Sequence, residues 1–417
     1  MLKIDYLRAN DFMKRLYLLL FMWSMLFSNP LAAQNSATLS KDATIFLLTI
    51  YPGDELYSTF GHTAIRIIDD TLGLDRIYNY GTFDFEEPGF YIKFCRGKLD
   101  YFLSAYRYKW AESVYTLEKR PIISQRLNLT PEMKNRIFQF LEWNRQPENR
   151  GYRYDFFFDN CATRILDAFE KTFPAEVNWH LKDRQLTFRN YIDQYLTGHP
   201  FSDYGIDLAL GAKTDRIASP RETAFLPDYL YDAFASAQVN INGEIQPLVA
   251  ETDTLLWFDE ANERSYSFPW ANIILWAVFL LAILITFREF KSNKNAEKRS
   301  WLDIFLFGYA GFVGMLIMFL WFGTDHTTTP NNWNLLWAWP LHIVISVLLL
   351  FRKKPAWLTA YLAICTGVLM ITLLGWAFWP QRLHTATIAM VLTLAVRGGW
   401  FVYKVRFHKK PHQLPAK

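Results

Sequence analysis

The feature that most constrains the fold of this chain is an abrupt change of composition after Phe268. Five mainly apolar runs follow, and each is near the roughly 20 residues that an α-helix needs to cross a bilayer. These runs cover residues 269–287, 301–323, 333–351, 355–379 and 385–403. The sequence therefore predicts an all-α transmembrane domain of about five helices over residues 269–403, preceded by a separate soluble domain.

Basic residues predict the orientation of these helices. Lys and Arg gather in the linker 288–299, in Arg352-Lys353-Lys354 and in the segment 404–410, and short cytoplasmic loops of membrane proteins carry such an excess. An odd number of crossings then puts residues 34–268 on the outer side of the membrane. Residues 404–417 are expected to form a basic cytoplasmic tail.

The N-terminus has the pattern of a secretory signal. A basic start at Lys14-Arg15 precedes an apolar stretch, which ends in a small-residue boundary at Ala33. We expect residues 1–33 to be a signal peptide. Leu31 is an imperfect residue for a cut after Ala33, so an uncleaved anchor is the alternative. The domain that follows is exported in both cases.

Composition fits a membrane protein with an exported domain. The chain is 51% hydrophobic and 18% aromatic, as a mixture of soluble and membrane-embedded parts requires. Its net charge is only +4, and the basic residues stand in short loops rather than in one patch. This distribution argues against a nucleic-acid partner.

Within the exported domain, residues 159–164 mark the start of a helix. Asp159 and Asn160 are N-cap residue types, and apolar residues then recur at helical spacing, so Cys161 should lie in the first turn. Unpaired N–H groups and the helix dipole favour a thiolate there, lowering a pKa that is about 8.5 in free cysteine. Cys161 is therefore a candidate nucleophile. A small, buried, inert cysteine fits the local pattern equally well.

A thiol nucleophile needs an imidazole base, which a third polar group orients. The exported domain offers His62, His180 and His199. His62 follows a glycine and begins an alternating run that predicts a strand, and a second strand is expected at 76–80 across a turn. A histidine on one strand, a polar residue on its hairpin partner and a cysteine at a helix start are the parts of a papain-like site.

Three motifs carry a resemblance to a known family. They are Tyr57-Ser58-x-Phe60-Gly61-His62-Thr63-Ala64-Ile65-Arg66, Tyr78-Asn79-Tyr80-Gly81-Thr82-Phe83-Asp84-Phe85 and Asp159-Asn160-Cys161-Ala162-Thr163-Arg164. Their order is that of the circularly permuted NlpC/P60 (papain-like) group. With the membrane spans that follow, the chain resembles the Lnb lipoprotein N-acyltransferases from about residue 40 to its C-terminus. The segment Phe225-Leu226-Pro227-Asp228 is also similar to the family, without an assigned chemistry.

The resemblance implies a fold and a location. The fold is an α+β permuted papain-like (NlpC/P60-like) domain over residues 34–268, on the periplasmic side of the bacterial inner membrane. The transmembrane domain over residues 269–403 follows this domain in the chain. Both implied substrates, a phospholipid and a lipoprotein, are located in the outer leaflet of that membrane.

The resemblance also implies a reaction. A fatty acyl chain would move from a phospholipid, through a Cys161 thioester, to the free α-amine of a lipoprotein's N-terminal lipidated cysteine. His62 is the expected base, and Asn79 is the expected residue that orients it. Tyr80, Asp84 and Asp155 are rivals for the third position. No cofactor is expected, and the absence of CxxC or HExxH spacing argues against a zinc site.

Other readings stay open. Permuted papain-like enzymes include amidases and peptidases, so a cell-wall amidase or peptidase is the first alternative, and a non-enzymatic membrane scaffold is the second. A Cys95–Cys161 disulfide is the main structural alternative for the cysteine, since both residues share an oxidising compartment. Cys365, in the fourth apolar run, is expected to be inert packing.

For residues in two further regions we have a functional hypothesis. The aromatic and basic stretch 83–107 is expected either to line an apolar acyl groove or to be ordinary core. Asp325-His326, in an outer loop, is a candidate for headgroup binding. Ionisable residues also occur at or within the apolar runs, where interhelix hydrogen bonds are the commoner explanation; they are Asp303, His342 and Arg397.

Overall fold

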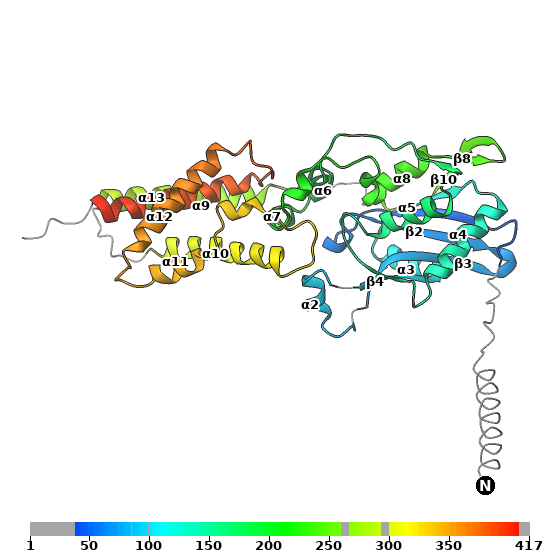
Figure 1. Ribbon diagram of the computed structural model, residues 1–417, viewed down its shortest axis with the longest axis horizontal. Helices are drawn as coiled ribbons and strands as arrows, with labels where there is room; N and C mark the ends of the chain where they lie inside the picture. Colours follow the sequence, from blue (N-terminus) through cyan, green and yellow to red (C-terminus); the bar gives the residue numbers. More distant parts are fainter. Residues whose placement is uncertain (1–37, 85, 99, 260–266, 293–299, 408–417) are drawn as a thin grey trace, which may run out of the picture. The chain divides into compact units, whose positions relative to one another are not determined.

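The computed structural model of this chain describes residues 38–407 except 85, 99, 260–266 and 293–299. The expected signal peptide lies outside the described residues, and so does most of the expected basic tail. The first described part is an α+β domain, and the second is helical, which confirms the predicted fold class at this level (Figure 1).

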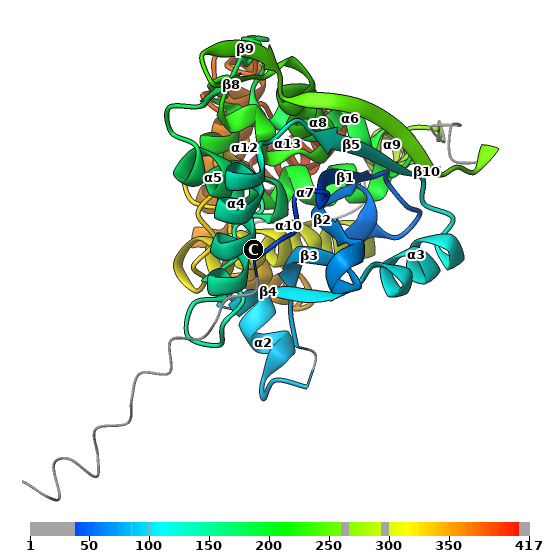
Figure 2. The ribbon, with the colours of Figure 1, turned by 90° about the vertical axis from the view of Figure 1, so that its right-hand side faces the viewer.

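The α+β domain is built on an antiparallel sheet. Its order is β10-β5-β1-β2-β3-β4-β6 among the described strands, and Figure 2 shows these strands across the domain. The strands are β1 (Thr44–Ile50), β2 (His62–Asp69), β3 (Leu74–Thr82), β4 (Asp100–Arg107), β5 (Ile122–Leu127), β6 (Gly151–Arg153) and β10 (Val249–Leu256). The strands predicted at His62 and at 76–80 are confirmed.

The hairpin of β2 and β3 follows from local chemistry. Asp69 caps the turn, since its carboxylate accepts hydrogen bonds from the N–H groups of Thr71 and Leu72. Gly73 then takes a left-handed conformation, with φ of 58°, which glycine adopts without strain. The turn fixes the register, in which Ile65 lies opposite Tyr78.

The two faces of the sheet carry different helices. On one face, Ile65 and Ile67 pack in a core that includes residues of α4 (Pro131–Asn144), α5 (Cys161–Thr172) and α8 (Pro227–Ser236). On the other face, Ile50 and Ala64 pack against α3 (Tyr108–Leu117). Alternation along β2 therefore assigns His62 to the α3 face and Thr63 to the α5 face.

The remaining described elements of this domain lie outside the large sheet and the helices named above. They are α2 (Phe90–Cys95), α6 (Phe188–Leu196), α7 (Pro200–Ala209), a small sheet of β7 (Val177–Asn178), β8 (Gln238–Ile241) and β9 (Glu244–Pro247), and the 3-10 helices η1 (Leu56–Ser58), η2 (Asp70–Leu72), η3 (Ala212–Asp215) and η4 (Glu222–Phe225).

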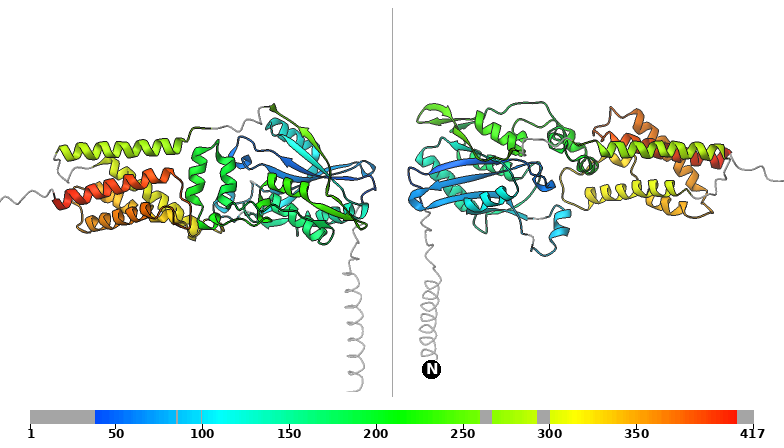
Figure 3. Two further views of the ribbon diagram at one scale, coloured as in Figure 1. Left: turned by 90° about the horizontal axis from the view of Figure 1, so that it is seen from above. Right: turned by 180° about the vertical axis from the view of Figure 1, so that it is seen from behind.

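The helical part has four helices that are long and apolar enough to cross a membrane, counted over the described residues. They are α9 (Trp270–Lys291), α10 (Trp301–Phe322), α12 (Trp357–Leu374) and α13 (Ala386–Phe407). Figure 3 shows these helices running alongside one another. Four of the five predicted spans are therefore single long helices among the described residues.

The third apolar run, 333–351, accounts for the difference. It forms a 3-10 helix, η6 (Trp333–Leu336), and a short helix, α11 (His342–Leu349), instead of one long helix. Pro340 stands between them, and a proline within a helix removes a backbone hydrogen bond and clashes with the preceding turn. Apolar length alone cannot detect this break.

Glycines of α10 make room for the broken segment. A Cβ on Gly314 would lie 2.2 Å from the Ala338 oxygen, and one on Gly311 would lie 2.3 Å from the Ile343 nitrogen. Further along, the Ser346 hydroxyl donates to the Ile304 oxygen. Irregular backbone is tolerated at membrane depth where protein buries it. The segment thus follows α10 back from its end toward its start, as a crossing segment must.

Polar side chains within the helical part are paired with one another. Arg397 is fully buried and contacts Asp303 at 2.5 Å and Glu289 at 3.2 Å. His342 bonds the Tyr361 hydroxyl at 2.9 Å and the Trp337 oxygen at 3.2 Å. These interhelix contacts satisfy groups that would otherwise be costly in a bilayer.

Candidate active site

Cys161 is the first residue of α5, as the motif predicts. The Asn160 side chain caps the helix by accepting from the N–H groups of Ala162 at 2.9 Å and Thr163 at 3.0 Å. Asn160 is itself buried, and its amide donates to the oxygens of Phe156 and Phe225. The cap therefore fixes both the start of the helix and the position of the cysteine.

The sulfur of Cys161 lies at the start of β2 and the end of β3. The backbone N–H groups of Thr63 and Ala162 face the sulfur. A Cβ on Gly81 would lie 3.9 Å from the Cys161 Cβ, so this glycine leaves the cysteine open from β3. Gly81 also has a φ of 93°, which an L side chain rarely adopts.

His62, the residue before Thr63, is held by Asn79. The Nε2 atom lies 2.6 Å from the Asn79 oxygen Oδ1, and the Asn79 amide donates to the Tyr106 hydroxyl at 3.0 Å. An amide oxygen only accepts, so Nε2 carries the hydrogen and Nδ1 keeps its lone pair. A neutral imidazole with an unprotonated Nδ1 is the form that accepts a proton from a thiol. Among the described residues, however, no hydrogen bond joins His62 to Cys161, and alternation along β2 puts the imidazole on the α3 face. The pairing of His62 with Cys161 therefore stays a prediction.

The rivals for the third position bond elsewhere. Tyr80 donates to Asn144 at 2.5 Å within the α4 core, and Asp84 accepts from the N–H of Glu86. Asp155 accepts from backbone N–H groups of its own loop and from Thr327. Asn79 is thus the candidate that contacts His62.

Burial sets the protonation of both groups. It raises the pKa of Cys161 to about 11, against the opposing effect of the facing N–H groups. It lowers the pKa of His62 to about 4. The expectation of a lowered thiol pKa is therefore wrong, because loss of hydration outweighs the helix N-terminus. At neutral pH the pair is a thiol and a neutral imidazole.

Arg120 is a site residue that the sequence motifs missed. Its side chain is 5% exposed, and it lowers the pKa of both Cys161 and His62. Nε donates to the Tyr51 oxygen at 2.9 Å and Nη1 to Glu118 at 3.1 Å, while the buried Nη2 has no partner among the described residues. The sequence motifs cannot reveal Arg120, because it reaches the site only through the pairing of the following strand, β5, with β1.

The other candidate groups lie outside this site. Cys95 is exposed, and Cys95 and Cys161 are both free thiols, so the structure does not contain the alternative disulfide. His180 bonds Gln238 at the surface. Asp325 pairs with Arg153 at 3.4 Å.

The aromatic stretch 83–107 divides between core and surface. Phe90 and Tyr101 are buried, and the Phe83 ring packs on both. Tyr91 and Phe94 of α2 are 77% and 54% exposed. The core reading therefore holds for Phe83, Phe90 and Tyr101, and the acyl-groove reading stays a prediction.

One group among the described residues has metal-ligand geometry. Ligand atoms of Asp203, Asp207 and His384 lie within 4.8 Å of one another. His384 already contacts Asp203 at 3.2 Å, and Asp207 forms an ion pair with the buried Arg189. These pairs explain the group as an ion-pair network that fixes α7, and we assign no metal to it.

Family comparison covers both parts of the chain. A family model described as the Lnb N-terminal periplasmic domain matches residues 32–194. A second model, described as the Lnb transmembrane domain, matches residues 262–409. Comparison with curated proteins and with solved structures gives no match. The permuted papain-like topology therefore remains a prediction.

Proposed function

Because the chain belongs to the Lnb family, we propose that it is a lipoprotein N-acyltransferase of the bacterial inner membrane, with its α+β domain in the periplasm. A phospholipid is the acyl donor, and the free α-amine of a lipoprotein's N-terminal lipidated cysteine is the acceptor. The observation that carries this proposal is the meeting of Cys161 with the His62 strand in a chain that matches both Lnb domains.

The first half-reaction forms a thioester. As the Cys161 sulfur attacks the ester carbonyl of the donor, its proton moves to Nδ1 of His62. Burial keeps both partners neutral beforehand, so the charge separation arises only in the transition state. The N–H groups of Cys161 and Thr63 are the donors best placed for the developing oxyanion. The intermediate collapses, and the imidazolium returns its proton to the lysophospholipid oxygen.

The second half-reaction forms the amide. The lipoprotein α-amine attacks the thioester carbonyl, His62 removes a proton from the nitrogen, and the C–S bond breaks as the thiol is restored. Asn79 keeps the imidazole in one orientation through both halves. A cell-wall amidase would use the same pair, but water instead of an amine would attack the acyl-enzyme.

Lipoprotein N-termini provide the cellular test. Cells that lack this protein should accumulate lipoproteins with a free α-amine, and mass spectra of their N-terminal peptides should lack one acyl chain. Restoring the wild-type chain, but not Cys161→Ala, should restore that mass. Identical spectra in all three strains, with altered cell-wall peptides, would replace the acyltransferase with an amidase.

A further inference from the structure

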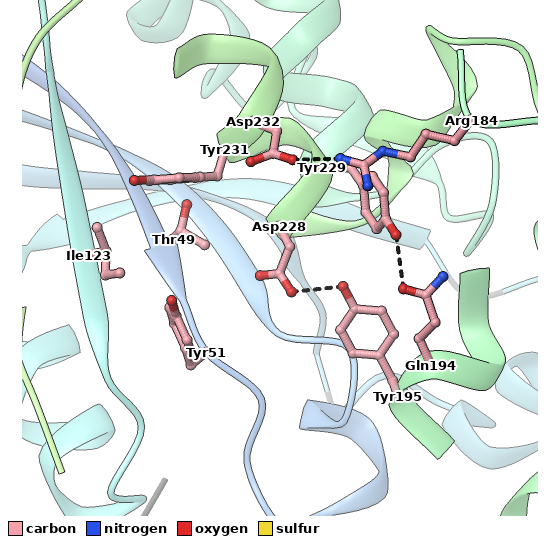
Figure 4. Close-up of a pocket in the computed structure, with 10 residues that line it drawn as sticks. All are labelled: Thr49, Tyr51, Ile123, Arg184, Gln194, Tyr195, Asp228, Tyr229, Tyr231 and Asp232. Carbon is pink, nitrogen blue, oxygen red and sulfur yellow. Dashed lines mark hydrogen bonds and ion pairs between the residues drawn. The ribbon is translucent and has the colours of Figure 1, made fainter. Parts of the chain in front are cut away.

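Two features of the α+β domain have no part in the chemistry above. The first is a cavity of about 310 Å³ between β1, α6 and α8, whose polar side chains bond one another (Figure 4). Arg184 pairs with Asp232 at 3.0 Å. The Tyr195 hydroxyl donates to Asp228 at 2.8 Å, and we assign the cavity no ligand. The second feature is helix α2, which Figure 2 shows projecting from the sheet beside β4.

The side of α2 that points away from the domain core is apolar. Phe90 is buried in that core. Tyr91, Ile92 and Phe94 are 77%, 68% and 54% exposed, and the Cys95 thiol is exposed beside them. At about 100° per residue, these four side chains cover nearly half of the helix circumference. Large apolar side chains that gather on a surface in this way mark an interaction site. We call these four residues the exposed face of α2.

Hydrogen bonds fix α2 to the end of a membrane helix. Asp325, in the loop after α10, donates its N–H to the Arg96 oxygen at 2.9 Å. In return, Arg96 Nε donates to the Gly323 oxygen at 3.3 Å. His326 Nε2 donates to the Cys95 oxygen at 3.2 Å. Because Gly323 directly follows α10, α2 lies at the level where that helix ends.

Aromatic side chains mark this level as a membrane interface. Trp321 and Phe322 stack at the end of α10, with ring centroids 5.1 Å apart. Phe268 and Trp270 pack together at the start of α9. Successive crossing helices run in opposite directions, so both pairs lie on the same side of the membrane. Such aromatic belts form where the headgroups meet water. The exposed face of α2 is therefore beside lipid.

The charges around α2 do not oppose contact with lipid. Lys93 pairs with Glu87. Lys98 lies 3.8 Å from the Asp325 carboxylate. The exposed face itself has no charged side chain. A helix of six residues is too short to hold a membrane alone, but its attachment to α10 already brings it to the interface, so little further entropy is lost on contact.

We propose that α2 is an interfacial helix, whose exposed face enters the leaflet on the side of the α+β domain. Such faces lie about 5–10 Å into the boundary between headgroups and acyl chains. Phe90 of α2 stacks on Phe83, with ring centroids 5.7 Å apart. Phe83 lies two residues after Gly81, which leaves Cys161 open. The position of α2 in the lipid therefore also sets the distance of the thiol from the leaflet.

Fluorescence quenching tests this position. Bimane is attached to Ile92→Cys in full-length protein that lacks its native cysteines, and the protein is placed in nanodiscs of phosphatidylethanolamine and phosphatidylglycerol. Lipid with a nitroxide on its upper acyl chain should remove most of the bimane fluorescence, whereas aqueous iodide should quench it weakly. Tyr91→Cys, at the most exposed position of α2, is a second probe site if Ile92→Cys does not fold.

Ile245→Cys is the matched control. Ile245 lies on β9 and is 69% exposed, against 68% for Ile92. It lies near the other end of the large sheet, where the Asn128 N–H, just after β5, donates to the Leu248 oxygen at 2.7 Å. Iodide should quench this probe and lipid should not. The same quenching pattern at both sites would overturn the proposal. Protection of the probe at residue 92 from both quenchers would also overturn it, because protein, such as a second copy, would then cover the face.

A second measurement follows the thiol, and it alone rests on the proposed function. Ile92→Asp removes the burial of one large apolar side chain, so labelling of Cys161 by bilayer phospholipid should fall about tenfold. A short-chain phospholipid dissolved as monomers should label variant and wild type equally, and Ile245→Asp should match wild type with both donors. Unchanged bilayer labelling in Ile92→Asp would overturn the role of α2 at the site. If no protein is labelled but lipid quenches the probe at residue 92, only the proposed function is rejected.

Discussion

At the scale of the residue, the proposed catalysis depends on a pair that is neutral at rest. The pKa of Cys161 is raised to about 11 and that of His62 is lowered to about 4, so neither is ionised near pH 7. Such a pair is protected from oxidation, since the reactive thiolate exists only while a substrate carbonyl is being attacked. Proton transfer and attack must then occur together.

Removing either member of the pair should abolish acylation. Cys161→Ala and His62→Ala each eliminate a group that acts only with the other, so the double variant should be no worse than the single ones. Asn79→Ala removes one hydrogen bond to the imidazole and should lower kcat about tenfold with KM little changed. Cys95→Ala, at an exposed free cysteine, is the control. Normal activity in folded His62→Ala would reject the assigned base.

The pH profile of kcat/KM should report His62 and its neighbour Arg120. The base must be neutral, so activity should be lost as the pH falls through about 4, not through the ordinary value near 6.5. Arg120 lowers the pKa of His62, so Arg120→Gln should move this acid limb to higher pH, whereas Arg120→Lys should move it less. The same Gln variant should raise the pH at which iodoacetamide alkylates Cys161. If neither the acid limb of kcat/KM nor the pH dependence of alkylation moved in Arg120→Gln, the role of Arg120 would be contradicted.

Cys161, His62 and Asn79 could be proposed from sequence because each lies in a local pattern: a helix start, a strand start and its hairpin partner. Arg120 and Thr63 could not be proposed. Arg120 reaches the site through the pairing of β5 with β1, and the Thr63 N–H is backbone, which no residue type signals. The predicted direction of the Cys161 pKa shift was wrong for a related reason: burial, which raises this pKa, is a property of the folded chain.

At the scale of the element, the break in the third apolar run is the feature that local patterns predict least well. Length and hydropathy counted 333–351 as one span, yet Pro340 divides it. The glycines of α10 were visible in the sequence, but only the structure shows what they contact. By contrast, helix α5 begins at Cys161 with Asn160 as its cap, as the motif 159–164 predicts, because a cap is a local pattern.

Gly311→Ala tests the packing of that broken segment. The added Cβ would lie 2.3 Å from the Ile343 nitrogen, which is backbone and cannot rotate away. Overpacking of this kind costs about 1–3 kcal/mol, so thermal unfolding in micelles should occur several degrees lower. Gly367→Ala on α12 is the matched control: its Cβ would meet nothing within 4 Å, and it should be neutral or stabilising. Equal behaviour of the two variants would contradict this packing.

At the scale of the whole molecule, the loops after α10 and α12 both contact the α+β domain. The Asp325 N–H donates to the Arg96 oxygen at 2.9 Å. The side chains of Asn332 and Gln381 each donate, at 2.7 Å, to the oxygens of Leu208 and Leu210. Both loops therefore lie on the domain's side of the membrane. We therefore propose that the chain between them crosses the membrane twice, and that the broken segment 333–351 makes one of these crossings.

Accessibility mapping tests this topology. Single cysteines placed at Pro200 and at the exposed Arg382 should react with an impermeant reagent from the periplasm, whereas one at Lys354 should react only after the membrane is permeabilised. The reason is the parity of five crossings, four by long helices and one by the broken segment. The background chain would carry replacements of Cys95, Cys161 and Cys365. Periplasmic labelling at Lys354 would show that 333–351 does not cross.

The most direct test of the central claim is to observe the acyl-enzyme. Purified full-length protein is mixed with phospholipid that carries a labelled acyl chain, before any lipoprotein is added. The account predicts that Cys161 becomes labelled, that neutral hydroxylamine releases the label as a thioester would, and that the label moves to the acceptor α-amine when lipoprotein is supplied. Transfer of label to the lipoprotein by folded Cys161→Ala protein would contradict the account.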